Sequence, residues 1–313
     1  MINVVLEKIE ESRARLSSTE SFRVFHGRGG CYPDMQWLCV DYFQPVLLFT
    51  FFQEPPDNFV SELADRFSTI AHTTTVSALL CQKRYAKEKG GCNKLELLAG
   101  EWSGELCARR GKLQFELSTN QQNIGYFLDI EPLRCWLEKH AHRTRVLNLF
   151  AFTCAFSVVA SACDAQSVVN IDLNKNALNR GRDNHRLNEL PGATSVTYLA
   201  HDILRSWGKL KRLGPYDIVI VDPPSFQKGS FVATKDYQKV LRKLPDLMSD
   251  NGYAVLCLNA PEISMQAFRR LVDAEVLPLL FCEALPVSED FPDVREPALK
   301  MLIYRFVRNW RQG

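Results

Sequence analysis

No two cysteines in this 313-residue chain are spaced as Cys-x-x-Cys, although the chain contains ten of them. Because structural zinc sites are usually built from such pairs, the sequence predicts no metal site. Long apolar runs are also missing: the longest, residues 45–52, is far shorter than the roughly 20 residues of a membrane-spanning helix. Residues 1–17 have the pattern of an amphipathic, charged helix and not of a signal peptide. We therefore expect a cytoplasmic protein with reduced cysteines.

The chain has little net charge as well. Its 38 Lys and Arg residues nearly balance 36 Asp and Glu residues, which leaves a formal charge of +2. A nucleic-acid partner would therefore have to bind a local basic patch. Each basic stretch by itself is more typical of a solvent-exposed face than of a phosphate site. The stretches are Lys83, Arg84, Lys87 and Lys89; Arg109, Arg110 and Lys112; and Arg305, Arg308 and Arg311.

Glycine is missing where a nucleotide-binding loop would need it. Residues 145–150 predict a buried β-strand, and the loop 151–157 that follows contains small residues but no glycine. A dinucleotide site needs Gly-x-Gly-x-x-Gly in this turn, and one common triphosphate site needs Gly-x-x-x-x-Gly-Lys followed by Ser or Thr. The absence of both patterns argues against a nicotinamide or flavin site and leaves that triphosphate site unsupported.

What the chain does have is an acidic, proline-rich ending on a predicted central strand. Residues 216–221 form a largely apolar run, which is typical of a buried parallel strand. Asp222 follows, and then Pro223 and Pro224, which end the strand because proline lacks the backbone N–H. Ligands of open α/β sheets bind at this edge. Asp222 and nearby carbonyls can accept a hydrogen bond from an amino or ring N–H, and Phe226 can stack on a flat base.

Two further predicted strands also lead to acids. Residues 167–172 end at Asp172, and Asp202 follows shortly after residues 196–199. Asp172 stands about twenty residues after the first strand's loop, the spacing at which a carboxylate accepts from ribose hydroxyls. One strand-end Asp is commonly a helix cap, but three in successive βα units should converge on one edge. S-adenosylmethionine, which carries a ribose but no phosphate, suits such a site.

Residues 123–305 resemble the class I methyltransferase family that modifies large-subunit ribosomal RNA. The family's Gly-x-Phe-Leu-Asp phrase corresponds to residues 125–129, and its Asn-Leu-Phe-x-Tyr-Thr-x-Gly-Phe-Ser phrase to residues 148–157. Its Asp-Pro-Pro-x-Phe phrase corresponds to residues 222–226, and residues 23–42 resemble its central RNA-facing domain. The resemblance implies S-adenosylmethionine as cofactor, an RNA partner and a parallel Rossmann-like sheet whose last strand is antiparallel.

The chain departs from the family pattern at three points. Ala155 stands where the family has glycine, which would strain any requirement for a positive φ. The helix after Asp129 begins with Ile130, Glu131 and Pro132, without the family's usual basic residue. The family's amino-terminal RNA-binding module has no counterpart in this sequence.

The strand ends and the resemblance together assign two sets of site residues. The catalytic set is Asp222, Pro223, Pro224, Ser225 and Phe226. The cofactor-binding set is Phe127, Asp129, Asn148, Phe150, Ala151, Thr153, Ala155, Asp172, Leu173, Asp202, Ile203 and Asp222.

Two domains are expected in this α/β protein. Residues 1–118 predict a small α+β domain for substrate recognition, and residues 119–313 predict the methyltransferase domain. Residues 277–287 and 299–307 leave no room for a helix between them, so they should pair antiparallel at the end of the sheet. The oligomeric state stays open, a homodimer included.

The acceptor atom depends on the end of the fifth strand, residues 253–259. Relatives that methylate carbon-5 of cytosine carry a nucleophilic cysteine there, whereas this chain has Asn259. Cys257 lies deeper in the strand, where a buried thiol is the usual case. A base nitrogen in ribosomal RNA is therefore the favoured acceptor, and 5-methylcytosine formation through Cys257 is the alternative. Methylation of a protein or small molecule, or binding without turnover, also stays open.

Overall fold

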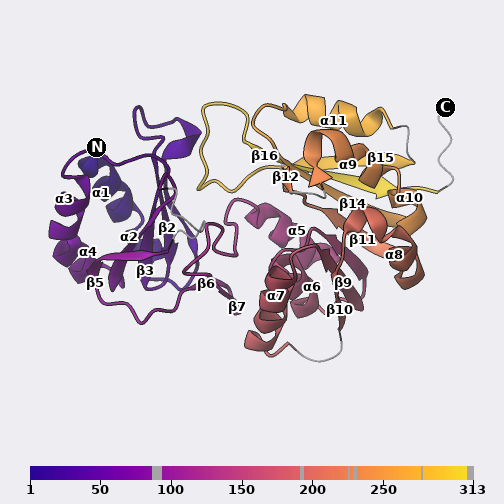
Figure 1. Ribbon diagram of the computed structural model, residues 1–313, viewed down its shortest axis with the longest axis horizontal. Helices are drawn as coiled ribbons and strands as arrows, with labels where there is room; N and C mark the ends of the chain where they lie inside the picture. The colour runs from indigo at the N-terminus through magenta and orange to yellow at the C-terminus, as the bar shows by residue number, and fades with distance from the viewer. Residues whose placement is uncertain (87–93, 191–193, 225, 228–230, 276–277, 309–313) are drawn as a thin grey trace. The chain divides into compact units, whose positions relative to one another are not determined.

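The computed structural model describes residues 1–86, 94–190, 194–224, 226–227, 231–275 and 278–308. Contacts divide the chain into two compact units (Figure 1). The first is Met1–Leu128 with Ser288–Arg295, and the second is Asp129–Val287 with Glu296–Gly313. The predicted division into 1–118 and 119–313 concerned domains with separate roles, and it stays a prediction. In the described ranges, no helix is both long enough and apolar enough to cross a membrane.

A five-stranded sheet forms the centre of the first unit, with its strands in sequence order. They are β1 (Phe22–His26), β2 (Leu38–Phe43), β3 (Val46–Phe51), β4 (Ala78–Lys83) and β5 (Glu96–Gly100). Only β3 and β4 pair in parallel. The apolar runs 22–25, 37–42, 46–52 and 76–81 predict the first four strands, whereas no such run predicts β5. It is an edge strand whose side chains are exposed or half-buried, so it lacks an apolar signature.

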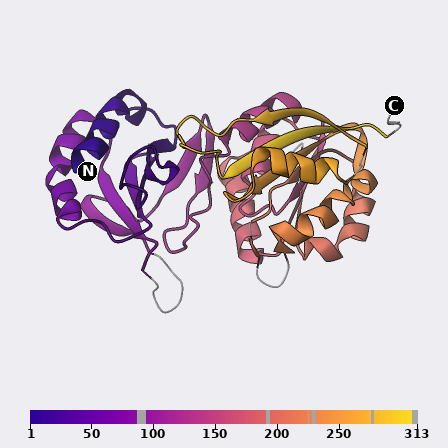
Figure 2. The ribbon, with the colours of Figure 1, turned by 90° about the horizontal axis from the view of Figure 1, so that it is seen from above.

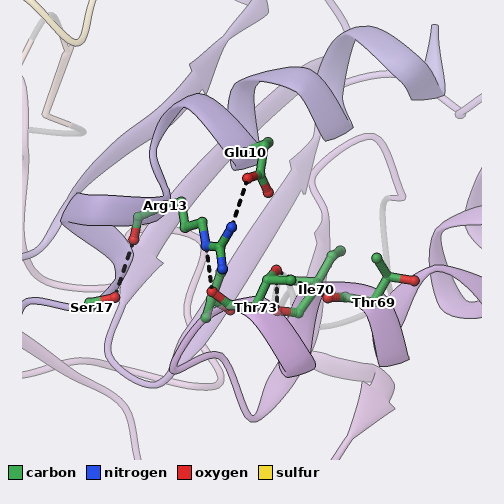
Figure 3. A network of polar contacts seen from close by, with 7 residues as sticks. Glu10, Arg13, Ser17, Thr69, Ile70 and Thr73 are labelled. Carbon is green, nitrogen blue, oxygen red and sulfur yellow. Dashed lines mark hydrogen bonds and ion pairs between the residues drawn. The ribbon is translucent and has the colours of Figure 1, made fainter.

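The described residues of this unit also form the α-helices α1 (Ile2–Glu11), α2 (Arg13–Leu16), α3 (Phe59–Asp65) and α4 (Phe67–Thr73). Apolar side chains of α1 and α3 share one core with the strands, among them Val5 and Leu63. The amphipathic helix predicted for residues 1–17 is thus confirmed as α1 and α2. Polar contacts join α2 to the end of α4, where Arg13 Nε donates to the Thr73 carbonyl at 3.0 Å (Figure 3).

A hairpin around Gly111 also belongs to the first unit. Its strands are β6 (Cys107–Arg110) and β7 (Leu113–Glu116), which pair antiparallel. Gly111 has φ 54°, a conformation that favours glycine.

The second unit contains a seven-stranded sheet in the order β10-β9-β8-β11-β14-β16-β15. Its strands are β8 (Arg145–Leu149), β9 (Ser167–Asp172), β10 (Ser195–Ala200), β11 (Tyr216–Val221), β14 (Met248–Asn259), β15 (Leu279–Leu285) and β16 (Leu299–Phe306). The first five strands in this order are mutually parallel, and β16 runs antiparallel to both of its neighbours. The predicted sheet and its antiparallel last pair are confirmed.

Helices cover both faces of this sheet (Figures 1 and 2). They are α5 (Glu131–His140), α6 (Ala155–Ala162), α7 (Lys175–Leu187), α8 (Trp207–Leu213), α9 (Ala233–Leu241), α10 (Leu244–Leu247) and α11 (Met265–Asp273). Leu147 and Leu149 of β8 share a core with α8, α9 and α11, whereas Asn148 between them faces α6. A parallel sheet covered on both faces explains why these strands are almost continuously apolar.

Candidate active site

Two loops meet where the order of the parallel strands reverses. β8 and β11 are neighbours, with Leu149 opposite Val221 at their carboxyl ends. From β8 the chain goes outward through β9 and β10, and from β11 it goes the other way through β14. The loops after β8 and β11 therefore flank the switch point, which is where open α/β sheets bind ligands.

The loop after β8 has a strained backbone. Phe150, Phe152 and Cys154 have φ of 58°, 46° and 60°, a region that residues with a Cβ rarely adopt. Ala155 is already the first residue of α6, so the positive φ falls on Cys154 and not on the alanine that replaces the family's glycine. Such strain persists only where the surroundings fix the backbone, and it concentrates at functional sites.

Helix α7 supplies much of that support. Asn184 Nδ2 donates to the Thr153 carbonyl at 3.1 Å, which fixes the loop from behind. Gly181 lies directly under Cys154: a Cβ on this glycine would overlap the Cys154 sulfur and lie 2.8 Å from its Cβ. The absence of a side chain at Gly181 thus lets the helix approach the strained turn.

Replacing this glycine tests the close packing. Alanine in place of glycine within a helix normally stabilises by up to about 1 kcal/mol. Gly181→Ala should instead destabilise by roughly 1–3 kcal/mol, because the added methyl group overpacks the contact with Cys154. Gly208→Ala in α8 is the matched control, since nothing lies within 4 Å of a Cβ there. Thermal unfolding of both variants gives the comparison, and equal midpoints would refute the packing argument.

Asp172 ends β9 with its carboxylate aimed at the same loop. One oxygen accepts from Phe152 N–H at 2.9 Å and the other from Asn174 N–H at 2.8 Å. The side chain is largely buried, which raises its pKa, while the backbone hydrogen bonds act in the opposite direction. Each oxygen retains a second lone pair for a ribose hydroxyl. Leu173 next to it is 42% exposed, an apolar surface beside the acid.

Asp202 caps a short helix close to it in the chain. It follows β10 and caps the short helix η2 (Ile203–Arg205) by accepting from Leu204 N–H at 2.9 Å. Its side chain is half-buried. Ile203, in contrast, packs its side chain into the core of the second unit. Of these two predicted cofactor residues, only Asp202 thus presents a side chain that is partly accessible.

Asn148 supports the site from inside the fold. Its amide donates to Asn170 Oδ1 at 2.9 Å, and Asn170 donates to Ser157 Oγ at 2.9 Å. Ser157 Oγ lies 3.0 Å from His185 Nε2, and His185 Nδ1 lies 2.8 Å from the Gly181 carbonyl. Since a carbonyl only accepts, Nδ1 carries the proton and Ser157 donates to Nε2. Burial lowers the pKa of His185, which favours this neutral ring.

This buried network joins β8 and β9 to α6 and α7, the elements that hold the strained loop. Sequence reasoning missed Ser157, Asn170 and His185 as its members. The polar residue inside an apolar strand was the available signal, because a buried amide needs partners. Asn148 Oδ1 is buried and has no hydrogen-bond partner among the described residues.

Asp222 sits at the end of β11 beside two other charged groups of the second unit. Burial, and then the charge of Asp129, raise the pKa of Asp222 to about 7, while Arg134 acts in the opposite direction. Arg134 is a fully buried cation on α5 that pairs with Glu131 at 3.2 Å. The family's usual basic residue is missing at the start of α5, but Arg134 one turn later brings a positive charge to this edge.

The rest of the proline loop is only partly described. Pro223 is buried and Pro224 is exposed. Ser225 and the side chain of Phe226 lie outside the described residues. The backbone of Phe226 begins β12 (Phe226–Gln227), which pairs antiparallel with β13 (Phe231–Val232).

Aromatic and small residues complete the loop after β8. The Phe150 ring meets the edge of Phe231 with centroids 4.7 Å apart, so β13 packs on this loop. Ala151 and Thr153 are buried, and Ala155 is half-buried at the start of α6. Phe127 belongs to the first unit, where its side chain is 47% exposed.

Cys257 is enclosed within β14. Its side chain is fully buried, and Tyr237 on α9 donates a hydrogen bond to its carbonyl at 3.0 Å. Burial raises the pKa of the Cys257 thiol well above its usual value, and the charges of Asp222 and Asp129 act in the same direction. Asn259 at the end of the strand is exposed. In the part of the chain described, no three His, Cys, Asp or Glu side chains are grouped to hold a metal ion.

The sheet order, the antiparallel β16 and the acids around the switch point define a Rossmann-like α/β enzyme of the class I methyltransferase type. Residues 22–305 match the family described as S-adenosylmethionine-dependent methyltransferase, and the chain belongs to this family. S-adenosylmethionine is accordingly its cofactor, and the chain is a methyltransferase. The residues fit that cofactor: the carboxylates of Asp172 and Asp202 can accept hydrogen bonds from hydroxyl or amino groups, and the exposed Leu173 offers an apolar surface.

Named relatives point the same way. YwbD of Bacillus subtilis, provisionally named a ribosomal RNA large subunit methyltransferase, is 27% identical over 286 residues, covering 86% of this chain and 69% of YwbD. Ribosomal RNA large subunit methyltransferase K/L of Psychrobacter sp. (strain PRwf-1) is 31% identical over 140 residues, covering 43% of this chain and only 17% of the relative.

A solved structure shows the same fold. SMU.776, provisionally named a methyltransferase and crystallised with S-adenosylhomocysteine, has a TM-score of 0.80 at 22% identity. The match covers 97% of this chain and 81% of SMU.776.

Proposed function

We propose that this methyltransferase modifies a nitrogen of a base in RNA, with ribosomal RNA as the first candidate. The names of the relatives support the RNA class, and an enzyme acting on ribosomal RNA would work in the cytoplasm. Residues 1–118 would then recognise the substrate.

The different surroundings of Asp222 and Cys257 favour a base nitrogen over carbon-5 of cytosine as the methyl acceptor. Asp222 stands at the switch-point edge of the sheet, where a flat base can reach its carboxylate. Cys257, the nucleophile that carbon methylation would need, is fully buried, and its raised pKa disfavours the thiolate. The alternative, 5-methylcytosine formation, would require the base or the thiol to move.

The residues act mainly by positioning. When bound, S-adenosylmethionine would supply a methyl group on a sulfonium, whose sulfur would leave as the neutral thioether of S-adenosylhomocysteine. Asp222 and the carbonyls of the proline loop would accept the N–H of the acceptor base and align its nitrogen in line with the methyl group. Because its pKa is about 7, Asp222 can also hold the proton that the nitrogen loses. Pro223, Pro224 and Ser225 would shape the loop, and Phe226 would stack on the base.

The other proposed site residues bind the cofactor. Asp172 and Asp202 would accept from its hydroxyl or amino groups, and Leu173 would contact its adenine. The strained loop would present backbone groups to its amino-acid end. The remaining members of the set are Phe127, Asp129, Asn148, Phe150, Ala151, Thr153, Ala155 and Ile203. Of these, Asn148 would act through the loop, since it is buried beneath it.

The pKa of Asp222 predicts how the rate of methyl transfer depends on pH. The carboxylate is the form that accepts a hydrogen bond, so the rate should rise with pH around the Asp222 pKa of about 7 and level off above it. Asp129→Asn removes the like charge that raises this pKa, so the rise should move to lower pH. Rates at saturating S-adenosylmethionine test this, with the exposed Asp246→Asn as a control. A rise that stays in place in Asp129→Asn would show that Asp222 does not set the profile.

Labelled methyl transfer tests the function itself. The enzyme is incubated with methyl-labelled S-adenosylmethionine and, in parallel, protein-free ribosomal RNA, transfer RNA, total protein and a small-molecule extract. We expect label in the RNA, and nucleoside digestion should place it on a base nitrogen. Label in protein or small molecules alone, or equal activity on free nucleosides, would contradict the proposal.

A further inference from the structure

A rigid turn in the first unit presents an arginine. Arg28 is the central residue of the short helix η1 (Gly27–Gly29) and is exposed. A Cβ on Gly27 would overlap the Met35 carbonyl, and one on Gly29 would overlap the Pro292 carbonyl. Val294 N–H donates to the Gly29 carbonyl at 2.9 Å. The turn is thus packed closely on both sides of Arg28, which limits the backbone freedom of this arginine.

A second arginine shares an aromatic ring with the first. The Arg28 guanidinium carbon lies 4.2 Å from the centroid of the Phe52 ring, and that of Arg84 lies 5.2 Å from it. Phe52 follows β3 and Arg84 follows the parallel neighbour β4, where the Arg84 N–H donates to the Phe51 carbonyl at 2.8 Å. Both Phe52 and Arg84 are half-buried. The sheet therefore holds Arg84 beside this ring, and the closely packed turn η1 holds Arg28 there.

Among the described residues, the neighbouring charges leave this cluster positive. Arg23 donates both Nε and Nη2 to Asp41, at 2.7 and 2.9 Å, so the buried carboxylate of Asp41 already has its partner. Burial, and then the charges of Arg23 and Arg28, lower the pKa of His26 to about 3, so that its ring is neutral. Arg28 and Arg84 form no ion pair within the described part of the chain.

Guanidinium groups near a ring are well suited to phosphate. A guanidinium that stacks on an aromatic face keeps its N–H donors in its own plane, free for two parallel hydrogen bonds to phosphate oxygens. We propose that Arg28, Arg84 and Phe52 form a binding site for backbone phosphates of the RNA substrate. The inference rests on the proposed RNA acceptor, and it assigns the phosphate contacts to residues outside the methyl-transfer site.

RNA binding by charge variants tests the site. Fluorescence anisotropy with a labelled single-stranded RNA of about 20 nucleotides is measured across about 50–200 mM salt. Arg28→Gln with Arg84→Gln should weaken binding at least about tenfold at low salt. It should also reduce the slope of log affinity against log salt by about 1.4, because each lost phosphate contact accounts for about 0.7. Phe52→Leu should weaken binding without changing the net charge.

Arg66→Gln is the matched control, because Arg66 is an exposed arginine of the same unit. It should change affinity less than about twofold, in line with the small effect of a solvent-exposed charge. Calorimetric titration with S-adenosylmethionine should be unchanged in every variant, and thermal unfolding should show that the first unit, which contains the changed residues, stays folded. With unmodified RNA that the enzyme methylates as substrate, KM should rise in the double variant while kcat stays constant.

The outcomes separate the two proposals. Suppose that wild type binds and methylates RNA, and that the double variant has the same RNA affinity and salt dependence as wild type or as Arg66→Gln. The phosphate site is then wrong, and the proposed function stands. If wild type neither binds nor methylates RNA, the proposed function itself fails. If polyglutamate binds wild type and loses affinity in the double variant as RNA does, the site recognises acidic peptides and the inference is overturned.

Discussion

Asp222→Ala should lower the rate of methyl transfer by roughly a hundredfold or more, because misplacing a reacting atom by about 1 Å has an effect of that size. Asp222 stands at the carboxyl end of β11, and its pKa of about 7 makes it both an acceptor for the N–H of a base and a holder for the released proton. Alanine removes both roles. Asp222→Asn keeps one acceptor oxygen without the charge, so its activity should lie between those of wild type and Asp222→Ala.

Cys257→Ala should keep most activity in the same assay. The thiol is fully buried in β14, so its removal should cost about 1 kcal/mol of folding stability through a small cavity without touching the acceptor. RNA containing 5-fluorocytosine supplies the decisive measurement. A covalent adduct that forms with wild type and disappears in Cys257→Ala would reverse the assignment, making Cys257 the nucleophile and 5-methylcytosine the product.

The second large effect should be on cofactor affinity. Asp172→Ala should weaken S-adenosylmethionine binding by a few kcal/mol, because two hydrogen bonds from ribose to a charged acceptor are lost at roughly 1.5–3 kcal/mol each. Part of the loss of affinity should come from a hydrogen bond within the protein that Asp172→Ala also removes. Asp172 also accepts from Phe152 N–H, so its loss frees the strained loop after β8. Calorimetric titration measures the affinity.

Asp202→Ala is the comparison for this prediction. It too removes an acid after a strand, but one whose internal hydrogen bond caps η2 and leaves the loop untouched. Its loss of affinity should be smaller than that of Asp172→Ala. Thermal unfolding without cofactor separates the two contributions in Asp172→Ala, since only the hydrogen bonds from Phe152 and Asn174 N–H contribute there. Affinity that stays at the wild-type value in Asp172→Ala would remove this residue from the proposed site.

The parallel strands of the second unit were predictable because they are buried on both faces. Residues 145–150, 167–172 and 216–221 are nearly continuous apolar runs, and each corresponds to a strand of the sheet. The short helices α8 and α11 were missed, because each buries few residues: Leu210 in α8, and Phe268 and Val272 in α11. The edge strand β5 was missed for the related reason that its side chains are largely accessible.

Within the candidate site, the sequence alone determined which chain segments meet. Strands that end in Asp172 and Asp222, and a glycine-free loop after residue 150, place these groups on one edge once the sheet is parallel. Local order along the chain is enough for this step, because the carboxyl ends of parallel strands lie together.

Only the tertiary structure decided how those groups behave. It shows that Cys154, and not Ala155, has the positive φ, and that Gly181 packs against that turn. It also shows that Asp129 lies close enough to raise the pKa of Asp222. It also set Arg28 and Arg84 beside one ring. Each of these facts depends on a close contact between residues that are not neighbours in the chain. Patterns of polarity and spacing predict the elements, whereas steric fit, burial and electrostatic interaction act over distances that only the packed fold defines.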